Sequence, residues 1–278
     1  MGLHLKDTKE GKDKSVVAGE ARVDEKYIKE YVTEDRTLSP IRITKLLLFI
    51  ALALLVGHVV VVHLALKALG IFSNSSSLPF FKEIHYALYN QFHLGLEGNL
   101  STYFSTFNLA LASILSYVVY STGKKATYHW LYLSLLFLFL SIDESAQLHE
   151  TFGGLAGSKF NSYLDEVPPF LSWAWMVPYA VFTLLVGLYF FKFTLKLPVK
   201  TRSLFYLSGC IYVFAALGLE FCEAHFDTLY GPDNVVNKFL FPIEEFLEMV
   251  GIIIFNYALL DYLMLNKKVL QFSFTDSK

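Results

Sequence analysis

Residues 130–150 of the chain have the sequence WLYLSLLFLFLSIDESAQLHE, and this stretch decides the fold class. Its apolar part, residues 130–142, is shorter than the ~20 residues that a helix needs to cross the hydrocarbon core of a membrane. A membrane helix here therefore has to include Asp143 and Glu144. A charged group within a bilayer costs a few kcal/mol or more, and such groups usually mark a functional position. The stretch predicts a membrane helix that carries acidic side chains at a functional end.

The rest of the sequence has the same apolar character. Hydrophobic residues make up 54% of the chain and aromatic residues 17%, which is typical of a multi-pass membrane protein. Long apolar runs predict six spans, at residues 46–66, 103–120, 128–148, 168–191, 203–222 and 239–260. We therefore expect an all-α fold, a polytopic membrane helix bundle with about six transmembrane helices.

The placement of basic residues predicts the orientation of this bundle. With six spans, three loops share one side of the membrane, and they hold only four of the 23 basic residues: Lys67, Lys82, Lys159 and Lys238. Because lysine and arginine accumulate in cytoplasmic loops, these three loops are predicted to be extracytoplasmic. Both termini are then cytoplasmic.

Outside the bundle we expect two tails. Residues 1–45 alternate basic and acidic side chains, which predicts a charged cytoplasmic tail or a short helix near residues 24–32 lying on the membrane. Residues 46–262 are expected to form the six-helix transmembrane domain, and residues 263–278 a short cytoplasmic tail. The first apolar run begins near Leu46, too far along the chain for a cleavable signal peptide.

Two kinds of chemistry are excluded by the sequence. Cys210 and Cys222 lie twelve positions apart on one predicted helix, about 18 Å, which is too far for a disulfide. No lysine lies in the middle of a span, where a retinal Schiff base would need one. The expected surroundings are membrane lipid, with a lipid or other apolar substrate and without a nucleic-acid partner.

Acidic and histidine side chains gather at the ends of three predicted spans. The clusters are Asp143, Glu144, His149 and Glu150; Glu220, Glu223, His225 and Asp227; and Glu244, Glu245 and Glu248. In the predicted topology all three clusters lie at the extracytoplasmic end, and His63 lies in the outer half of the first span. The spacing of seven residues between Asp143 and Glu150 predicts that both lie on one helix face.

Carboxylates this close to one another cannot all stay ionised without a cation or bound protons. Carboxylate-rich ligation with one or two imidazoles suits a divalent ion such as Fe, Mn or Zn. We therefore expect a metal site, with Glu144 and Glu245 as the catalytic acid or base. Its candidate ligands are Asp143, His149, Glu150, Glu220, Glu223, His225, Glu244, Glu248 and His63.

Simpler interpretations exist for some of these residues. Glu244 and Glu245 follow Pro242, so they could form the first turn of a helix and complement its dipole. Glu150, His225 and Asp227 could lie in solvent just outside the membrane. A lone histidine in an apolar helix, such as His63, is more often a hydrogen-bonded packing residue.

Two segments carry a resemblance to known proteins. Residues 140–150, LSIDESAQLHE, and residues 242–251, PIEEFLEMVG, resemble a group of uncharacterised bacterial multi-pass membrane proteins with Asp-Glu-x4-His-Glu and Glu-Glu-x-x-Glu segments. The resemblance covers about residues 103–260. It implies a location in the plasma membrane, the bacterial inner membrane, and implies no particular activity.

Three functions remain open at this point. The favoured one is a metal-dependent membrane enzyme, a hydrolase or an oxidoreductase, acting on a lipid or apolar substrate near the outer leaflet. The second is a proton- or cation-coupled transporter or channel subunit, since carboxylates within a bundle can relay protons or bind Na⁺. The third is an accessory membrane subunit whose polar groups bind a partner helix. The sequence does not fix the oligomeric state.

Overall fold

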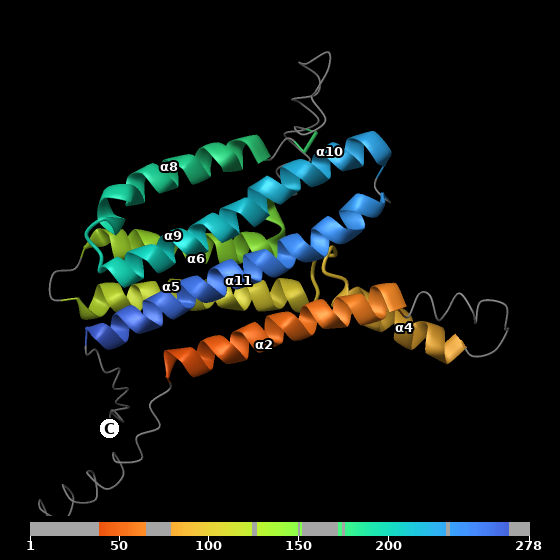
Figure 1. Ribbon diagram of the computed structural model, residues 1–278, viewed down its shortest axis with the longest axis horizontal. Coiled ribbons are helices and arrows are strands. Elements are labelled where there is room, and N and C mark those ends of the chain that lie inside the picture. Colours follow the sequence, from red (N-terminus) through yellow and green to blue (C-terminus); the bar gives the residue numbers. More distant parts are fainter. Residues whose placement is uncertain are drawn as a thin grey trace, which may run out of the picture. The chain divides into compact units, whose positions relative to one another are not determined.

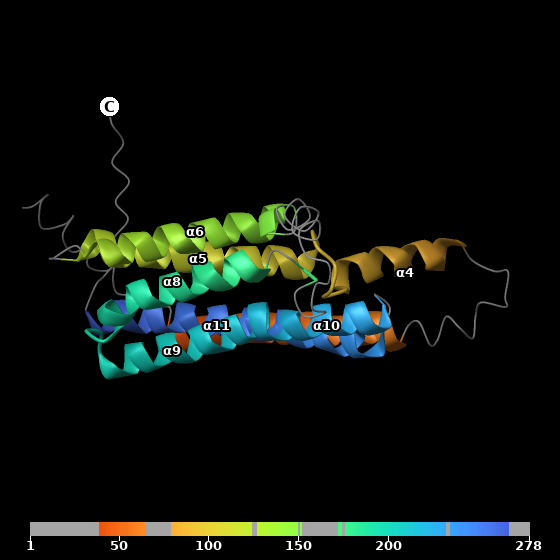
Figure 2. The ribbon, with the colours of Figure 1, turned by 90° about the horizontal axis from the view of Figure 1, so that it is seen from above.

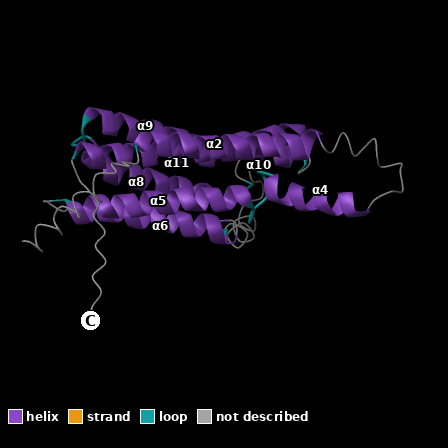
Figure 3. Cartoon of the chain, turned by 90° about the horizontal axis from the view of Figure 1, so that it is seen from below, coloured by secondary structure: helices purple, strands orange, loops and turns teal. Residues whose placement is uncertain are grey.

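The structure is a computed structural model that describes residues 39–64, 79–123, 127–149, 151, 172–173, 176–231 and 234–266. All of its regular elements within these ranges are helices, as Figure 3 shows. The elements are α2 (Pro40–His58), the π-helix η1 (Val59–Leu64), α4 (Pro79–Phe92), α5 (Leu100–Thr122), α6 (Tyr128–Ala146), α8 (Met176–Thr194), α9 (Val199–Val213), the π-helix η3 (Phe214–Leu219), α10 (Glu220–Tyr230) and α11 (Val235–Leu265).

Five helical segments are long and apolar enough to cross a membrane. They are Pro40–Val62, Leu100–Thr122, Met176–Thr194, Val199–Tyr230 and Val235–Leu265. Each coincides with one of the expected spans. The remaining expected span, residues 128–148, forms the 19-residue helix α6 and is not among these five.

Several boundaries differ from the sequence-based expectation. The first helix begins at Pro40, so residues 40–45 belong to it and not to the tail. The fifth segment continues through η3 and α10 to Tyr230, and the last begins at Val235. Helix α4 occupies part of the first predicted outer loop, where no helix was expected. Apolar runs reveal the membrane portion of a helix, whereas its polar extension into the interface has no such signal.

Polar caps explain where two central helices begin. The side chain of Asn99 accepts hydrogen bonds from the backbone N–H groups of Ser101 and Thr102 at the start of α5. At the start of α11, the side chain of Asn234 accepts a hydrogen bond from the backbone N–H of Asn237. Such caps satisfy backbone donors that have no partner inside the helix.

Helix α11 is the centre of the bundle and contacts α2, α5, α9 and α10 (Figures 1 and 2). A Cβ atom added at Gly251 would lie only 3.0 Å from the backbone nitrogen of Tyr212, so the backbones of α9 and α11 approach closely there. Small residues permit such close packing of membrane helices. The side chain of Asn256 donates a 3.0 Å hydrogen bond to the carbonyl of Asn108 and joins α11 to α5.

Candidate functional site

A cavity of about 450 Å³ lies among α6, α8, the continuous α9–η3–α10 segment and α11. The loop before α5 also contributes to its wall, through Gly95 and Glu97. Residues of four helical segments therefore contribute to one cavity within the bundle. The volume lies within the usual range for small-molecule sites.

The cavity has an unusually acidic lining. Eight carboxyl groups and one imidazole line it: Glu97, Asp143, Glu144, Glu220, Glu223, Glu244, Glu245, Glu248 and His149. None of the lining residues that the structure describes is a lysine or an arginine. In the described part of the wall, His149 is therefore the only basic side chain beside eight carboxyl groups.

Most of the remaining lining is apolar, and much of it lies at the end of the cavity away from the acids. On α6, Phe137 and Leu140 precede Asp143; on α11, Ile252 and Phe255 follow Glu248. Since α6 and α11 run in opposite directions, both place their acids at the same end. The α9–η3–α10 segment agrees with this pattern, because its aromatic and aliphatic lining residues precede its acids. The cavity is thus amphipathic, with an acidic end and an apolar end.

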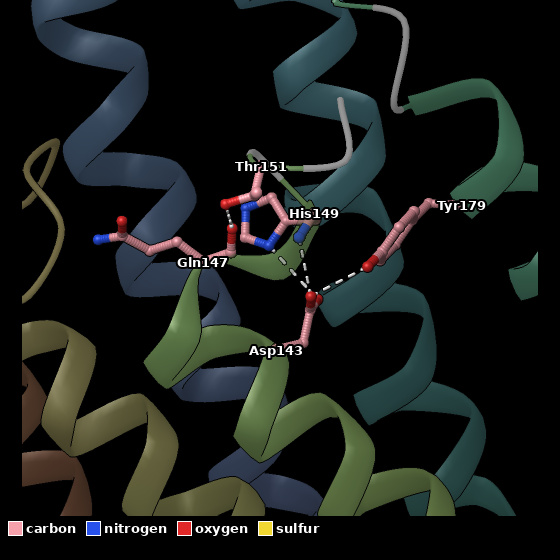
Figure 4. Close-up of polar contacts among 5 residues, drawn as sticks. All are labelled: Asp143, Gln147, His149, Thr151 and Tyr179. Carbon is pink, nitrogen blue, oxygen red and sulfur yellow. Dashed lines mark hydrogen bonds and ion pairs between the residues drawn. The ribbon is translucent and has the colours of Figure 1, made fainter. Parts of the chain in front are cut away.

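Asp143 is the centre of a hydrogen-bond network at the acidic end (Figure 4). Its Oδ1 accepts hydrogen bonds from the backbone N–H of His149 at 2.9 Å and from the hydroxyl of Tyr179 at 3.0 Å. Its Oδ2 lies 3.3 Å from Nδ1 of His149. One buried carboxylate therefore ties the end of α6 to the following turn and to α8.

A left-handed residue makes this network possible. Gln147, with φ 52°, ends α6 directly after Ala146, and beyond it the backbone N–H of His149 donates back to Asp143. Glu150 lies outside the described residues, so the helix face that it was expected to share with Asp143 stays a prediction. When Nδ1 of His149 donates to the Asp143 carboxylate, the lone pair of the ring is on Nε2, as in histidines that act as bases or ligands.

Glu223 and Glu244 are the most buried glutamates in the described lining of the cavity. They are 1% and 9% exposed, and they lie near each other where α10 packs on α11. The Oε1 atom of Glu223 has no hydrogen-bond partner within the described part of the chain. Two neighbouring buried carboxyl groups cannot both stay ionised without a bound proton or a cation. The backbone carbonyl of Glu223 accepts a bond from Asn237, which fixes α10 against α11.

The π-helix η3 directly precedes Glu220. A π-turn inserts an extra residue into a helix and rotates all that follows, and such turns are frequent at functional sites. Here the rotated residues are Glu220 and Glu223, which both line the cavity. The local break in helical geometry therefore sits where the acidic end begins.

The structure places the predicted site residues as follows. It brings to the cavity Asp143, Glu144, His149, Glu220, Glu223, Glu244, Glu245 and Glu248. His225 does not line the cavity and instead lies against the ring of Phe226. Glu150 and the side chain of His63 lie outside the described residues.

The helix-dipole interpretation of Glu244 and Glu245 does not hold. Pro242 lies inside α11, which begins seven residues earlier at Val235, so these acids are not in a first turn. In the part of the chain that the structure describes, no group of three or more His, Cys, Asp or Glu side chains has the arrangement that holds a metal ion.

Sequence reasoning missed two residues of the acidic end. Glu97 lies in a short loop without helical periodicity, and its Oε2 accepts a hydrogen bond from Thr102 at 3.3 Å. Tyr179 is one of many tyrosines in apolar runs, so nothing in the sequence marks it. The Asn99 cap two residues after Glu97 is the one local signal, because it fixes the start of α5 there.

An all-helical bundle with five segments able to cross a membrane, arranged around an internal acidic cavity, defines an α-helical membrane protein. The chain belongs to the family described as "Domain of unknown function (DUF8692)", whose profile matches residues 46–263. Comparisons with curated proteins and with solved structures find no match.

Proposed function

We propose that this protein is a membrane enzyme that acts on an amphipathic, lipid-like substrate in the cavity, with a divalent cation bound among the carboxyls. In this proposal α6 crosses the plasma membrane as a sixth span, and both termini are cytoplasmic. The cavity then lies toward the extracytoplasmic leaflet.

One observation carries the proposal: eight carboxyl groups line a cavity to which no lysine or arginine contributes within the described residues. Charges so crowded within a bundle need a positive partner or bound protons. Carboxylate oxygens with one imidazole suit Fe, Mn or Zn. The proposal requires the carboxyls to move toward the ion when it binds.

The roles of individual residues follow from their positions. Glu223 and Glu244, the most buried glutamates of the described lining, are the proposed core of the cation site. Asp143 orients His149 as a ligand or base. Glu144 and Glu245, which line the same end, remain the proposed acid and base for the reacting group.

The test uses protein purified from its native membranes. Its content of Fe, Mn and Zn is measured, and lipid extracts are incubated with it in vesicles and followed by mass spectrometry, with and without a chelator. The proposal expects bound metal and a lipid whose consumption stops with the chelator. Metal-free protein, together with lipid turnover that the chelator does not change, would contradict it.

A second function is favoured by a separate observation. Three residues on one face of α5 (Ser105, Asn108 and Ser116) and Asn256 on α11 are buried, and each has a side-chain oxygen without a hydrogen-bond partner in the described structure. Buried polar groups of this kind are commonly bridged by water. A row of water-bridged polar groups along α5 and α11 would give a proton- or cation-coupled transporter a path for its ion. Flux driven by a pH or ion gradient that disappears in Glu220→Gln would favour this function over the enzyme.

A further inference from the structure

The cavity lies beside the least buried face of the bundle. In each helix we consider the 18-residue apolar stretch suited to crossing the membrane. Only 11% of this stretch is buried in α8 and 17% in the α9–α10 segment, against 50% in α5 and in α11. Both poorly buried segments line the cavity. In a bilayer their exposed sides would face lipid, so among the described residues these two segments form a thin wall between the cavity and the lipid.

The lining itself is open between them. Phe182 of α8 is 39% exposed and Val213 of α9 is 38% exposed, although both line the cavity. Gly209 lies one turn from Val213 on the same wall, and a Cβ added there would have no atom within 4 Å. At these three residues the lining of the cavity is only partly covered by other side chains, and we name this part of the wall the side opening.

We infer that the cavity takes a long-chain amphiphile with an amine head group, which enters from the lipid through the side opening. The inference rests on the proposed function, since it assigns the substrate class of the same cavity. The alkyl chain would lie along Ile252 and Phe255, and the head would reach the carboxyls. On α11, Glu248 and Phe255 are about 10 Å apart, so one extended chain spans both ends.

Charge decides the head group. An ammonium group has three N–H donors and a positive charge, and it can contact several carboxylates at once. A carboxylate or phosphate head would meet like charges in a desolvated site, which costs several kcal/mol. The ammonium would supply positive charge next to the carboxyl groups of the lining.

The test uses the full chain in vesicles of phosphatidylcholine and a long-chain alkylamine with a photoactivatable group at the end of its chain. A probe with the same chain and a carboxylate head is the comparison. After irradiation, labelled peptides are mapped by mass spectrometry. The inference expects the amine probe to label peptides that contain Phe182, Ile252 or Phe255, and to do so roughly tenfold more than the carboxylate probe.

Two glycines provide a matched pair of variants. Gly209→Trp fills the side opening and should abolish labelling of the cavity peptides. Gly187→Trp, on α8 and also without atoms within 4 Å of an added Cβ, lies outside the lining and should leave labelling unchanged. If Gly209→Trp fails to fold, Val213→Trp obstructs the same opening.

Three results would overturn the inference: equal labelling by both probes, undiminished labelling in a folded Gly209→Trp, or no labelling of the cavity by either probe. The metal content of the same preparations separates this failure from that of the proposed function. If the protein binds metal but does not prefer the amine probe, the amine head group is rejected. The proposed metal-dependent enzyme is not rejected by that result.

Discussion

The hydroxyl of Tyr179 donates a 3.0 Å hydrogen bond to Oδ1 of Asp143, and this bond joins α8 to α6 at the acidic end of the cavity. At the opposite end, α8 is fixed by aromatic packing, because the ring of Phe193 stacks on His129 with centroids 4.9 Å apart. Helix α8 is therefore held at both ends while its middle forms the cavity wall.

The first prediction concerns this bond. Tyr179→Phe should lower the free energy of unfolding in mixed micelles by about 0.6–1.7 kcal/mol, the usual range for side-chain hydrogen bonds between membrane helices. It should also speed amide exchange in the first turns of α8. Tyr189→Phe is the control, since Tyr189 lies on the same helix and packs on His129 through its ring. Equal exchange in both variants would show that the bond does not hold α8.

The second prediction concerns the role of Asp143. Because its two oxygens are occupied by His149 and Tyr179, we expect it to orient the histidine and not to bind the cation itself. Asp143→Asn should weaken Mn²⁺ binding about 10- to 100-fold, as is usual for residues that orient a ligand. Asp227→Asn, which changes an acid outside the cavity lining, should bind Mn²⁺ as the unmodified chain does. An unchanged affinity in Asp143→Asn would reject this role.

The third prediction concerns the contact between α9 and α11. A Cβ at Gly251 would lie 3.0 Å from the backbone nitrogen of Tyr212 and 3.2 Å from the carbonyl oxygen of Ser208, atoms that cannot move without shifting α9. Gly251→Ala should therefore destabilise the bundle by about 1–3 kcal/mol in mixed-micelle unfolding. Gly187→Ala, which meets no neighbouring atom, should be neutral or stabilising. Equal free energies of unfolding for the two variants would contradict this close contact between α9 and α11.

The fourth prediction concerns topology. In a chain whose exposed free cysteines Cys210 and Cys222 are replaced by serine, single cysteines at Ser39 and Asn266 should react with a membrane-impermeant maleimide only after the cells are opened. A cysteine at Gly98, in the loop beside the acidic end, should react in intact cells. Labelling of Ser39 and Gly98 from the same side would contradict six spans with cytoplasmic ends.

The sequence alone was enough to predict the helical class and the approximate positions of the five helical segments that are long and apolar enough to cross a membrane, because both follow from the lengths of apolar runs. It also predicted that acids from separate helices would lie at one end, since alternating directions bring the ends of spans three, five and six together. Eight of the predicted residues do line one cavity.

The details that the sequence did not predict depend on backbone geometry. The left-handed Gln147 turns His149 back onto Asp143, and no residue pattern marks a glutamine for that conformation. The π-turn before Glu220 changes which face its acids occupy, and apolar periodicity does not show such an insertion. The side opening at Gly209 depends on how loosely α8 packs, which is a tertiary property.

The central claim is that the carboxyls of the cavity share a positive partner, and a Mn²⁺ titration followed by electron paramagnetic resonance tests it most directly. The purified chain in vesicles is titrated beside the double variant Glu223→Gln/Glu244→Gln and a control, Glu83→Gln, which alters an exposed carboxyl on α4. We predict one tight Mn²⁺ site in the unmodified chain and in the control, and its loss in the double variant. Equal Mn²⁺ binding by all three proteins, or no tight site in any of them, would contradict the claim.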